Sequence, residues 1–238
     1  MLATRVTEEA VRAVPEPRFT DSWHPMAHYK VLDVLDSAIT STGIEIVKKN
    51  YSLSADKTNV FWTWTLSQVE NGLQWMVGGR NSISKCFALG ITAGNWITVC
   101  SNMNISGDYL EFRRHTGHLD YNELQELIGR AMTKLIDRLT ELTRWHIGLK
   151  EYPLYENSYS FKALTFDAMR AGAFPSSKFK EFLTCIEEER MVDSDHFSLY
   201  NFHGACTRLM RENSLFNIAH RSVNIKTVLD DYIDAKVV

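Results

Sequence analysis

The sequence predicts an α+β protein, in which an antiparallel β-sheet of five to six strands is packed by an N-terminal helix and a long helix. A C-terminal helical annex follows the sheet. Three observations predict this fold. No proline occurs between Pro25 and Pro153, which suits a sheet whose central strands need every backbone donor. Apolar residues alternate with period two in the middle of the chain and recur at helical spacing in the last third. Hydrophobic residues make up 45% of the 238 residues, enough to bury a sizeable core.

The first elements are an arm and a helix. Residues 1–22 are expected to form a loosely ordered arm. The N-terminal helix is predicted to begin at Pro25, a favourable first helical residue, and to end before Gly43, a good terminator. Its apolar stripe consists of Tyr29, Leu32, Leu35 and Ile39.

The strands follow from residue 44 onward. Residues 44–53 alternate, residues 60–66 are rich in aromatic and β-branched side chains, and Asn71-Gly72 before residues 73–77 is a strong hairpin signal. Two more hairpin turns are predicted, at Ala93-Gly94-Asn95 and at Ser106-Gly107-Asp108. They would separate strands over residues 86–92, 96–100 and 109–113.

Helices are expected to fill the rest of the chain. Asp120 and Glu123 form a capping box for a long helix over residues 121–149, whose leucine-rich stripe is interpreted as the face on the sheet. A partner helix in an oligomer is the alternative use of that stripe. Further helices are predicted over residues 161–171, 177–190, 197–211 and 222–232. The predicted organisation is therefore an arm (1–22), an α+β core (23–150) and an α-helical annex packed on the core (151–238).

Composition and charge exclude several classes of protein. The chain has 26 Lys and Arg against 29 Asp and Glu, a balance that argues against coating nucleic acid by charge alone. The charged N-terminus does not fit a signal peptide, so we expect no membrane partner. The four cysteines, Cys86, Cys100, Cys185 and Cys206, form no C-x-x-C pair, which indicates free, mostly buried thiols.

Residues able to bind a metal occur in two places. His115 and His118 lie near Asp120, but in a predicted strand-to-helix turn, so exposed turn residues are the simpler interpretation. His196, His203 and Cys206 share one helical face, which is more typical of a packed helix. No nucleophile elbow, Walker loop or zinc-protease motif is present. We therefore predict no catalytic residues, no metal, no cofactor and no enzymatic activity.

The middle of the chain is locally basic and aromatic. The nucleic-acid-binding candidates are Arg80, Lys85, Arg113, Arg114 and His115. Gly78, Gly79, Asn81 and Ser82 are candidates for a phosphate-binding turn after a strand, because backbone amides in such a turn can cradle a phosphate. Relief of crowding at the end of the sheet is an equal explanation for the glycines. Trp62, Trp64, Trp75 and Trp96 could stack on bases, although each is more simply a core residue.

The order of short motifs resembles the uncharacterised phage/plasmid-like protein family, a family defined by a domain of unknown function. The motifs are WHPMAH (23–28), the hairpin before Phe61, GRNS (79–82), ITVCSNM (97–103) with Ser106-Gly107, RRHT (113–116) and LYNFHG (199–204). The resemblance covers residues 23–232 and implies a cytoplasmic protein of a mobile element in a bacterial host, with no established activity. The family commonly continues its Asn-Ser motif with His-Asp, whereas Ile83 and Ser84 stand here.

Two functional hypotheses follow. The first is a phage or plasmid protein of nucleic-acid transactions, such as recombination, that binds or anneals single-stranded DNA as a homo-oligomer. The order of helix, hairpins and long helix, which is similar to the core of the Rad52-like annealing proteins, favours it at the level of fold. The alternative is an accessory protein that binds a host protein, such as an inhibitor of a defence system. The acidic annex, with Glu187, Glu188 and Glu189, favours the alternative.

Overall fold

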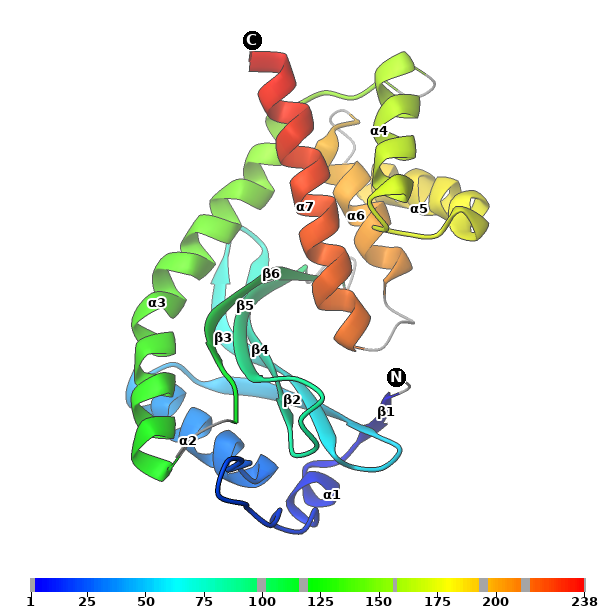
Figure 1. Ribbon diagram of the computed structural model, residues 1–238. Helices are drawn as coiled ribbons and strands as arrows, with labels where there is room; N and C mark the ends of the chain where they lie inside the picture. The colour runs from blue at the N-terminus through cyan, green and yellow to red at the C-terminus, as the bar shows by residue number, and fades with distance from the viewer. Residues whose placement is uncertain are drawn as a thin grey trace. The chain divides into compact units, whose positions relative to one another are not determined.

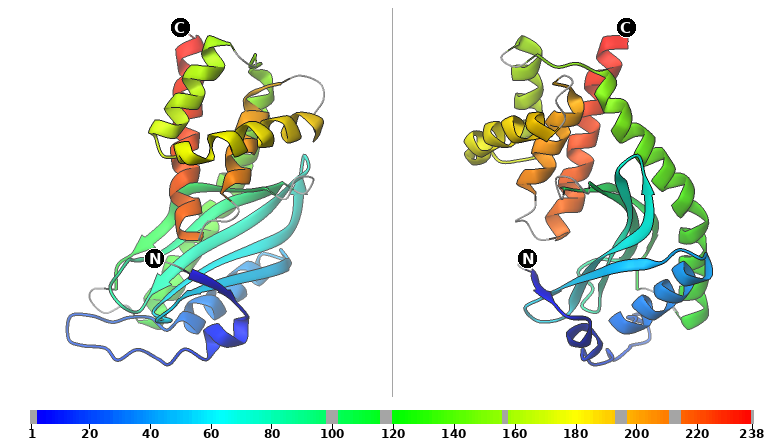
Figure 2. Two further views of the ribbon diagram at one scale, coloured as in Figure 1. Left: turned by 90° about the vertical axis from the view of Figure 1, so that its right-hand side faces the viewer. Right: turned by 180° about the vertical axis from the view of Figure 1, so that it is seen from behind.

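The computed structural model describes residues 3–97, 102–115, 120–155, 158–192, 197–210 and 215–237 of the chain. The chain divides into two compact units (Figures 1 and 2). Unit 1 comprises Met1–Val69, Gln74–Gly94 and Asp108–Leu139, and unit 2 comprises Glu70–Leu73, Asn95–Gly107 and Thr140–Val238. The predicted class, α+β with a helical C-terminal region, is confirmed.

Six strands form one sheet in which their order in space follows their order in the sequence. Strand β1 pairs antiparallel with β2, and β2 pairs antiparallel with β3. The strands are β1 (Ala3–Val6), β2 (Ile46–Ser54), β3 (Asn59–Glu70), β4 (Leu73–Ser82), β5 (Leu89–Ile97) and β6 (Asn102–Arg113). The predicted antiparallel sheet of five to six strands is confirmed.

One face of this sheet forms the core of unit 1 together with helices α2 (His28–Ser41) and α3 (Tyr121–Gly148). Along β3, Val60, Trp62, Trp64 and Leu66 are all buried in this core, because alternate residues of a strand point to the same face. In Figure 1, α2 and the first part of α3 lie beside the sheet. The leucine-rich stripe of α3 packs on the sheet, as the sequence predicts.

Gly79 of β4 makes room for the indole of Trp62, which β3 carries. A Cβ atom at this position would lie 2.3 Å from Cζ2 of Trp62 and 2.6 Å from the carbonyl oxygen of Gly90. Only a residue without a side chain leaves room for the indole. Relief of crowding is thus the reason for this glycine.

The turns of the sheet are predicted in part. Asn71 and Gly72 have φ of 52° and 78°, as the two-residue turn of a hairpin requires, so the hairpin between β3 and β4 is confirmed. The turns predicted at residues 93–95 and 106–108 are wrong, because both triplets lie inside strands, in β5 and β6. The alternation of Leu89, Ile91 and Ala93, all fully buried, carries β5 past the expected turn. The chain between β5 and β6 lies outside the described residues.

The N-terminal segment is more ordered than the expected loose arm. Residues Ala3–Val6 pair with Tyr51–Ser54 of β2, and α1 (Glu8–Arg12) follows directly. Val11 is fully buried in the core of unit 1, and Arg12 makes ion pairs with Glu8 and Asp33. The segment is held by the burial of Val11 and by the pairing of β1 with β2. The composition of the segment does not predict either contact.

Helix α3 begins where the sequence predicts. The backbone amide of Glu123 donates to Oδ1 of Asp120 at 2.8 Å, a side-chain cap at the first turn. The helix runs through the boundary between the units, since its residues up to Leu139 belong to unit 1 and those from Thr140 to unit 2. The boundary expected after residue 150 therefore falls about three helical turns earlier.

Unit 2 is mainly helical. A short 3₁₀ helix (Leu149–Glu151) follows α3, and another (Ser176–Lys178) precedes α5. Among the described residues, no helix is both long and apolar enough to cross a membrane. The remaining helices are α4 (Tyr159–Arg170), α5 (Phe179–Val192), α6 (Leu199–Leu209) and α7 (Leu215–Val237).

The core of unit 2 combines stacked phenylalanines with a buried ion pair. The rings of Phe174 and Phe182 stack with centroids 4.6 Å apart. Glu189 of α5, 2% exposed, accepts hydrogen bonds from Nε and Nη2 of Arg208 in α6 at 2.8 and 2.7 Å. A Cβ atom at Gly204 would lie 2.5 Å from Oε2 of Glu189, so α5 and α6 approach closely at this glycine.

Candidate nucleic-acid interface

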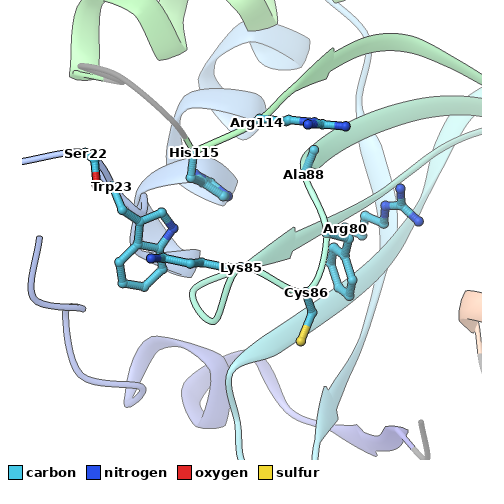
Figure 3. A pocket seen from close by; sticks show the side chains of 9 residues that line it. Ser22, Trp23, Arg80, Lys85, Cys86, Ala88, Arg114 and His115 are labelled. Carbon is cyan, nitrogen blue, oxygen red and sulfur yellow. The ribbon is translucent and has the colours of Figure 1, made fainter. Parts of the chain in front are cut away.

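Unit 1 contains a basic hollow of about 580 Å³ (Figure 3). Its volume falls in the range of about 300–1,000 Å³ typical of small-ligand sites. Three cationic side chains line it, and none of the described residues that line it is acidic. The lining residues, which we call the basic hollow, are Ser22, Trp23, Arg80, Lys85, Cys86, Phe87, Ala88, Arg114 and His115.

Arg80 reaches the hollow because of the strand that carries it. Residues 75, 77 and 79 of β4 face the core of unit 1, so the side chain of Arg80 leaves the opposite face. Its guanidinium carbon lies 4.9 Å from the ring centre of Phe87. The guanidinium of Arg80 and the ring of Phe87 thus form a cation–π pair in the wall of the hollow.

Lys85 lies in the loop between β4 and β5, at a backbone φ of 63°. The loop is anchored by a hydrogen bond from the amide of Ile83 to the carbonyl of Thr58 at 2.8 Å. The ammonium of Lys85 lies 5.1 Å from the ring centre of Trp23, and Figure 3 shows its side chain reaching toward the indole. The hollow thus pairs a cation with each of its two aromatic rings.

Arg114 and His115 directly follow β6 and close another side of the hollow. Arg114 is exposed, whereas His115 is 4% exposed. Neither ring nitrogen of His115 has a hydrogen-bond partner in the part of the chain that the structure describes. Burial, together with repulsion between His115 and His28 when both are protonated, lowers the pKa of His115 to about 4, so its ring is neutral at pH 7.

The Trp23 side of the hollow is held in place by buried polar contacts. Nδ2 of Asn81 donates to the carbonyl of Met26 at 2.9 Å and to Nδ1 of His28 at 3.0 Å. Nδ1 of His28 therefore accepts, and Nε2 carries the proton that is donated to the carbonyl of Lys57 at 3.2 Å. Burial lowers the pKa of His28 to about 4, which agrees with a neutral ring. His28 is a positioning residue, which the sequence places in the WHPMAH motif but not among the site candidates.

The phosphate-binding turn predicted at residues 78–82 is wrong. Strand β4 contains all four candidates, Gly78, Gly79, Asn81 and Ser82. They are therefore part of the sheet and do not form a turn after it. Asn81 is fully buried and bonded to Met26 and His28, and Gly79 makes room for Trp62. Of residues 78–82, only Arg80 is among the described residues that line the hollow.

The other candidates divide between the hollow and the rest of the molecule. The structure brings Arg80, Lys85, Arg114 and His115 together in the hollow. Arg113 does not line it, and its Nη2 pairs instead with Glu123 at 3.3 Å. The simpler interpretation of the strand tryptophans, as core residues, is confirmed for three of them, since Trp62 and Trp64 are 1% exposed and Trp75 is 9% exposed. The side chain of Trp96 lies outside the described residues.

The metal candidates are not assembled into a site in the described residues. His118 and His196 lie outside those residues. His203 and Cys206 are fully buried in α6, and no group of three potential ligand residues occurs among the described side chains. Cys185 and Cys206 are buried free thiols, Cys86 is an exposed one in the hollow, and Cys100 is not described.

Comparison with known protein families, curated proteins and solved structures found no match for this chain. The proposed function therefore rests on the residues of the basic hollow.

Proposed function

We propose that the protein is non-enzymatic and binds single-stranded nucleic acid through the basic hollow. The observation that carries the proposal is the lining itself, in which Arg80, Lys85 and Arg114 meet Trp23 and Phe87 and no described lining residue has a carboxylate. Cations bind the phosphates of a strand, and aromatic rings stack on its unpaired bases. Single strands fit this chemistry better than duplexes because their bases are free to stack.

The contact between Lys85 and Trp23 supports this proposal energetically. A cation at 5.1 Å from an aromatic ring contributes about 0.5–1 kcal/mol at an exposed site. A base stacked on an aromatic ring contributes about 1–3 kcal/mol. A base can therefore displace the ammonium of Lys85 from the indole, and the freed ammonium can pair with a phosphate.

The net charge of −3 limits the proposal to a local site. Binding should depend on the hollow and should weaken as salt rises, because counterions are released from the strand when cations contact it. The order of helix, hairpins and long helix, which is similar to that of the Rad52-like annealing proteins, makes annealing of complementary strands by a homo-oligomer the transaction to test first.

Fluorescence anisotropy with a labelled oligothymidylate at low salt tests the proposal. We expect the wild-type protein to bind, and we expect Arg80→Gln, Lys85→Gln and Arg114→Gln each to weaken binding. Arg113→Gln is the matched control, since Arg113 neighbours Arg114 in sequence but does not line the hollow. The proposal fails if the wild-type protein binds no strand at low salt, or if Arg113→Gln weakens binding as much as Arg114→Gln does.

Exposed aromatic side chains in unit 2 favour a second candidate, binding to a host protein. Tyr155, Tyr159 and Phe166 are 75%, 87% and 62% exposed, and aromatic side chains are enriched at protein interfaces. A pull-down from nuclease-treated bacterial lysate tests it, with the triple variant Tyr155→Ser, Tyr159→Ser, Phe166→Ser as control. A captured protein that the wild type and the triple variant retain equally would contradict this candidate.

A further inference from the structure

The charge of the basic hollow exceeds what an internal phosphate of a strand requires. Arg80, Lys85 and Arg114 bring three positive charges to its wall, and no side chain in the described part of the lining is negative. A phosphodiester inside a strand carries one negative charge, whereas a phosphomonoester carries about −1.5 to −2 at pH 7. A terminal phosphate therefore matches the hollow better than an internal one.

Unpartnered ring nitrogens in the wall of the hollow point to a second part of the ligand. Nε1 of Trp23 and both ring nitrogens of His115 are buried and have no hydrogen-bond partner among the described residues. Because the ring of His115 is neutral, one nitrogen donates and the other accepts. Buried polar atoms of this kind are costly when unpaired, so a ligand that pairs them is favoured. A nucleobase edge offers both donors and acceptors.

The positions of these groups suit a nucleotide. In Figure 3, Trp23 and His115 lie on one side of the hollow, and Arg80 and Arg114 lie on the other. A base at Trp23 and His115 would place its own phosphate near the two arginines. The ammonium of Lys85 lies over the indole of Trp23. When a base stacks on the indole instead, this ammonium can move to the phosphate of the same nucleotide.

We propose that the basic hollow binds a nucleoside phosphomonoester, either as the phosphorylated end of a strand or as a free nucleotide. As the end of a strand, this assignment rests on the function proposed above. Trp23 and His115 contact the base, and Arg80, Lys85 and Arg114 contact the phosphate. The protein would then distinguish a phosphorylated end from a hydroxyl end.

The test compares oligothymidylates that differ only at their ends. We expect an oligonucleotide with a terminal phosphate, at the 5′ or the 3′ end, to bind about tenfold or more tightly than the same strand with hydroxyl ends. Thymidine monophosphate should compete with the labelled strand, and inorganic phosphate should compete at least about tenfold less well, because it lacks the base. Arg114→Gln should abolish the preference for a phosphorylated end, and Arg113→Gln should keep it.

The outcomes separate this assignment from the proposed function. Equal affinity for phosphorylated and hydroxyl ends overturns the assignment while strand binding stands. Inorganic phosphate competing as well as thymidine monophosphate also overturns it, since the base would then contribute nothing. Binding of the free nucleotide without binding of any strand supports the hollow as a nucleotide site and overturns the proposed function. Absence of binding to all of these probes overturns both.

Discussion

The imidazole rings of His146 and His203 pack edge to face in unit 2, with centroids 4.7 Å apart and planes at 73°. Both residues are fully buried, and their four ring nitrogens have no hydrogen-bond partner within the described part of the chain. Burial lowers the pKa of His203 to about 3. Burial, with the charges of His203 and Lys150, lowers the pKa of His146 well below its usual value. Both rings are therefore neutral in the folded protein at pH 7.

Acid should destabilise the protein in a pH range where few carboxylates titrate. An unfolded histidine takes up a proton near pH 6.5, whereas folded His203, His28 and His115 resist protonation until about pH 3 to 4. The unfolded state binds more protons in this range, so the free energy of unfolding falls as the pH decreases from 6.5. For each such histidine we expect a loss of about 2 kcal/mol at pH 5. Urea unfolding at pH 7 and pH 5 measures it.

Two histidine variants test whether buried histidines cause the loss of stability between pH 7 and pH 5. His203→Leu removes a buried titrating group, so its loss of stability between pH 7 and pH 5 should be smaller than that of the wild-type protein. His220 is exposed, and His220→Gln should lose as much stability as the wild type. An unchanged pH dependence in His203→Leu would contradict the assignment, whatever its stability at pH 7.

Gly79→Ala should destabilise unit 1. The added Cβ would overlap the indole of Trp62 and the carbonyl of Gly90. The shifts that accommodate such overpacking lower the free energy of unfolding by about 1–3 kcal/mol. Gly129 in α3 is the control, because a Cβ there meets no atom within 4 Å. Gly129→Ala should be neutral or stabilise the helix by up to about 1 kcal/mol. Thermal unfolding followed by circular dichroism compares them, and equal melting temperatures for the two variants would show that the indole of Trp62 does not lie against Gly79.

Arg208→Met should be more harmful than loss of an exposed ion pair. It leaves the carboxylate of Glu189 buried without its cation, which costs about 3–5 kcal/mol. Arg170 pairs with Asp167 at 3.2 Å, with side chains 74% and 47% exposed, and Arg170→Met should cost less than about 1 kcal/mol. Urea unfolding at neutral pH measures both variants. Similar losses in the two would argue against burial of Glu189.

The salt dependence of strand binding should count the phosphate contacts. Each phosphate that a single strand shares with the protein contributes about −0.7 to the slope of log affinity against log salt. Arg80→Gln and Arg114→Gln should each make this slope shallower by about 0.7, and Arg113→Gln should leave it unchanged. Titrations at several salt concentrations provide the slopes. Parallel lines for all variants would mean that the arginines of the hollow do not contact phosphates.

Local patterns predicted most of the fold. The turn at Asn71-Gly72, the cap at Asp120 and the stripe of α3 depend on neighbours in sequence, and the structure contains all three. The turns at residues 93–95 and 106–108 were wrong because glycine and asparagine also occur inside strands when the neighbouring strand accepts them. Pairing of Ala3–Val6 with β2 joins residues about fifty positions apart, and no local pattern contains it.

The candidate site was predicted in part. The sequence indicated that the middle of the chain is locally basic, and four of the five basic candidates line the hollow. It could not separate Arg114 from Arg113, because only the three-dimensional arrangement pairs Arg113 with Glu123. Trp23 and Phe87 are not among the residues that the sequence indicates as ligand contacts, because the tryptophans of the strands, which fill the core, give the stronger aromatic pattern. An aromatic residue in a polar, non-periodic segment, such as Trp23, is the signal that could have found it.

The path of the chain through the two units constrains how this protein can be dissected and inherited. The chain passes from one unit to the other after Val69, Leu73, Gly94, Gly107 and Leu139. No single cut in the gene separates the units, and a break near Leu139 divides α3 in its middle. Fragments ending there would expose the apolar stripe of half a helix. A recombination event that swaps one unit for a foreign counterpart would need several breakpoints at once, so we expect relatives of this protein to exchange the two units together.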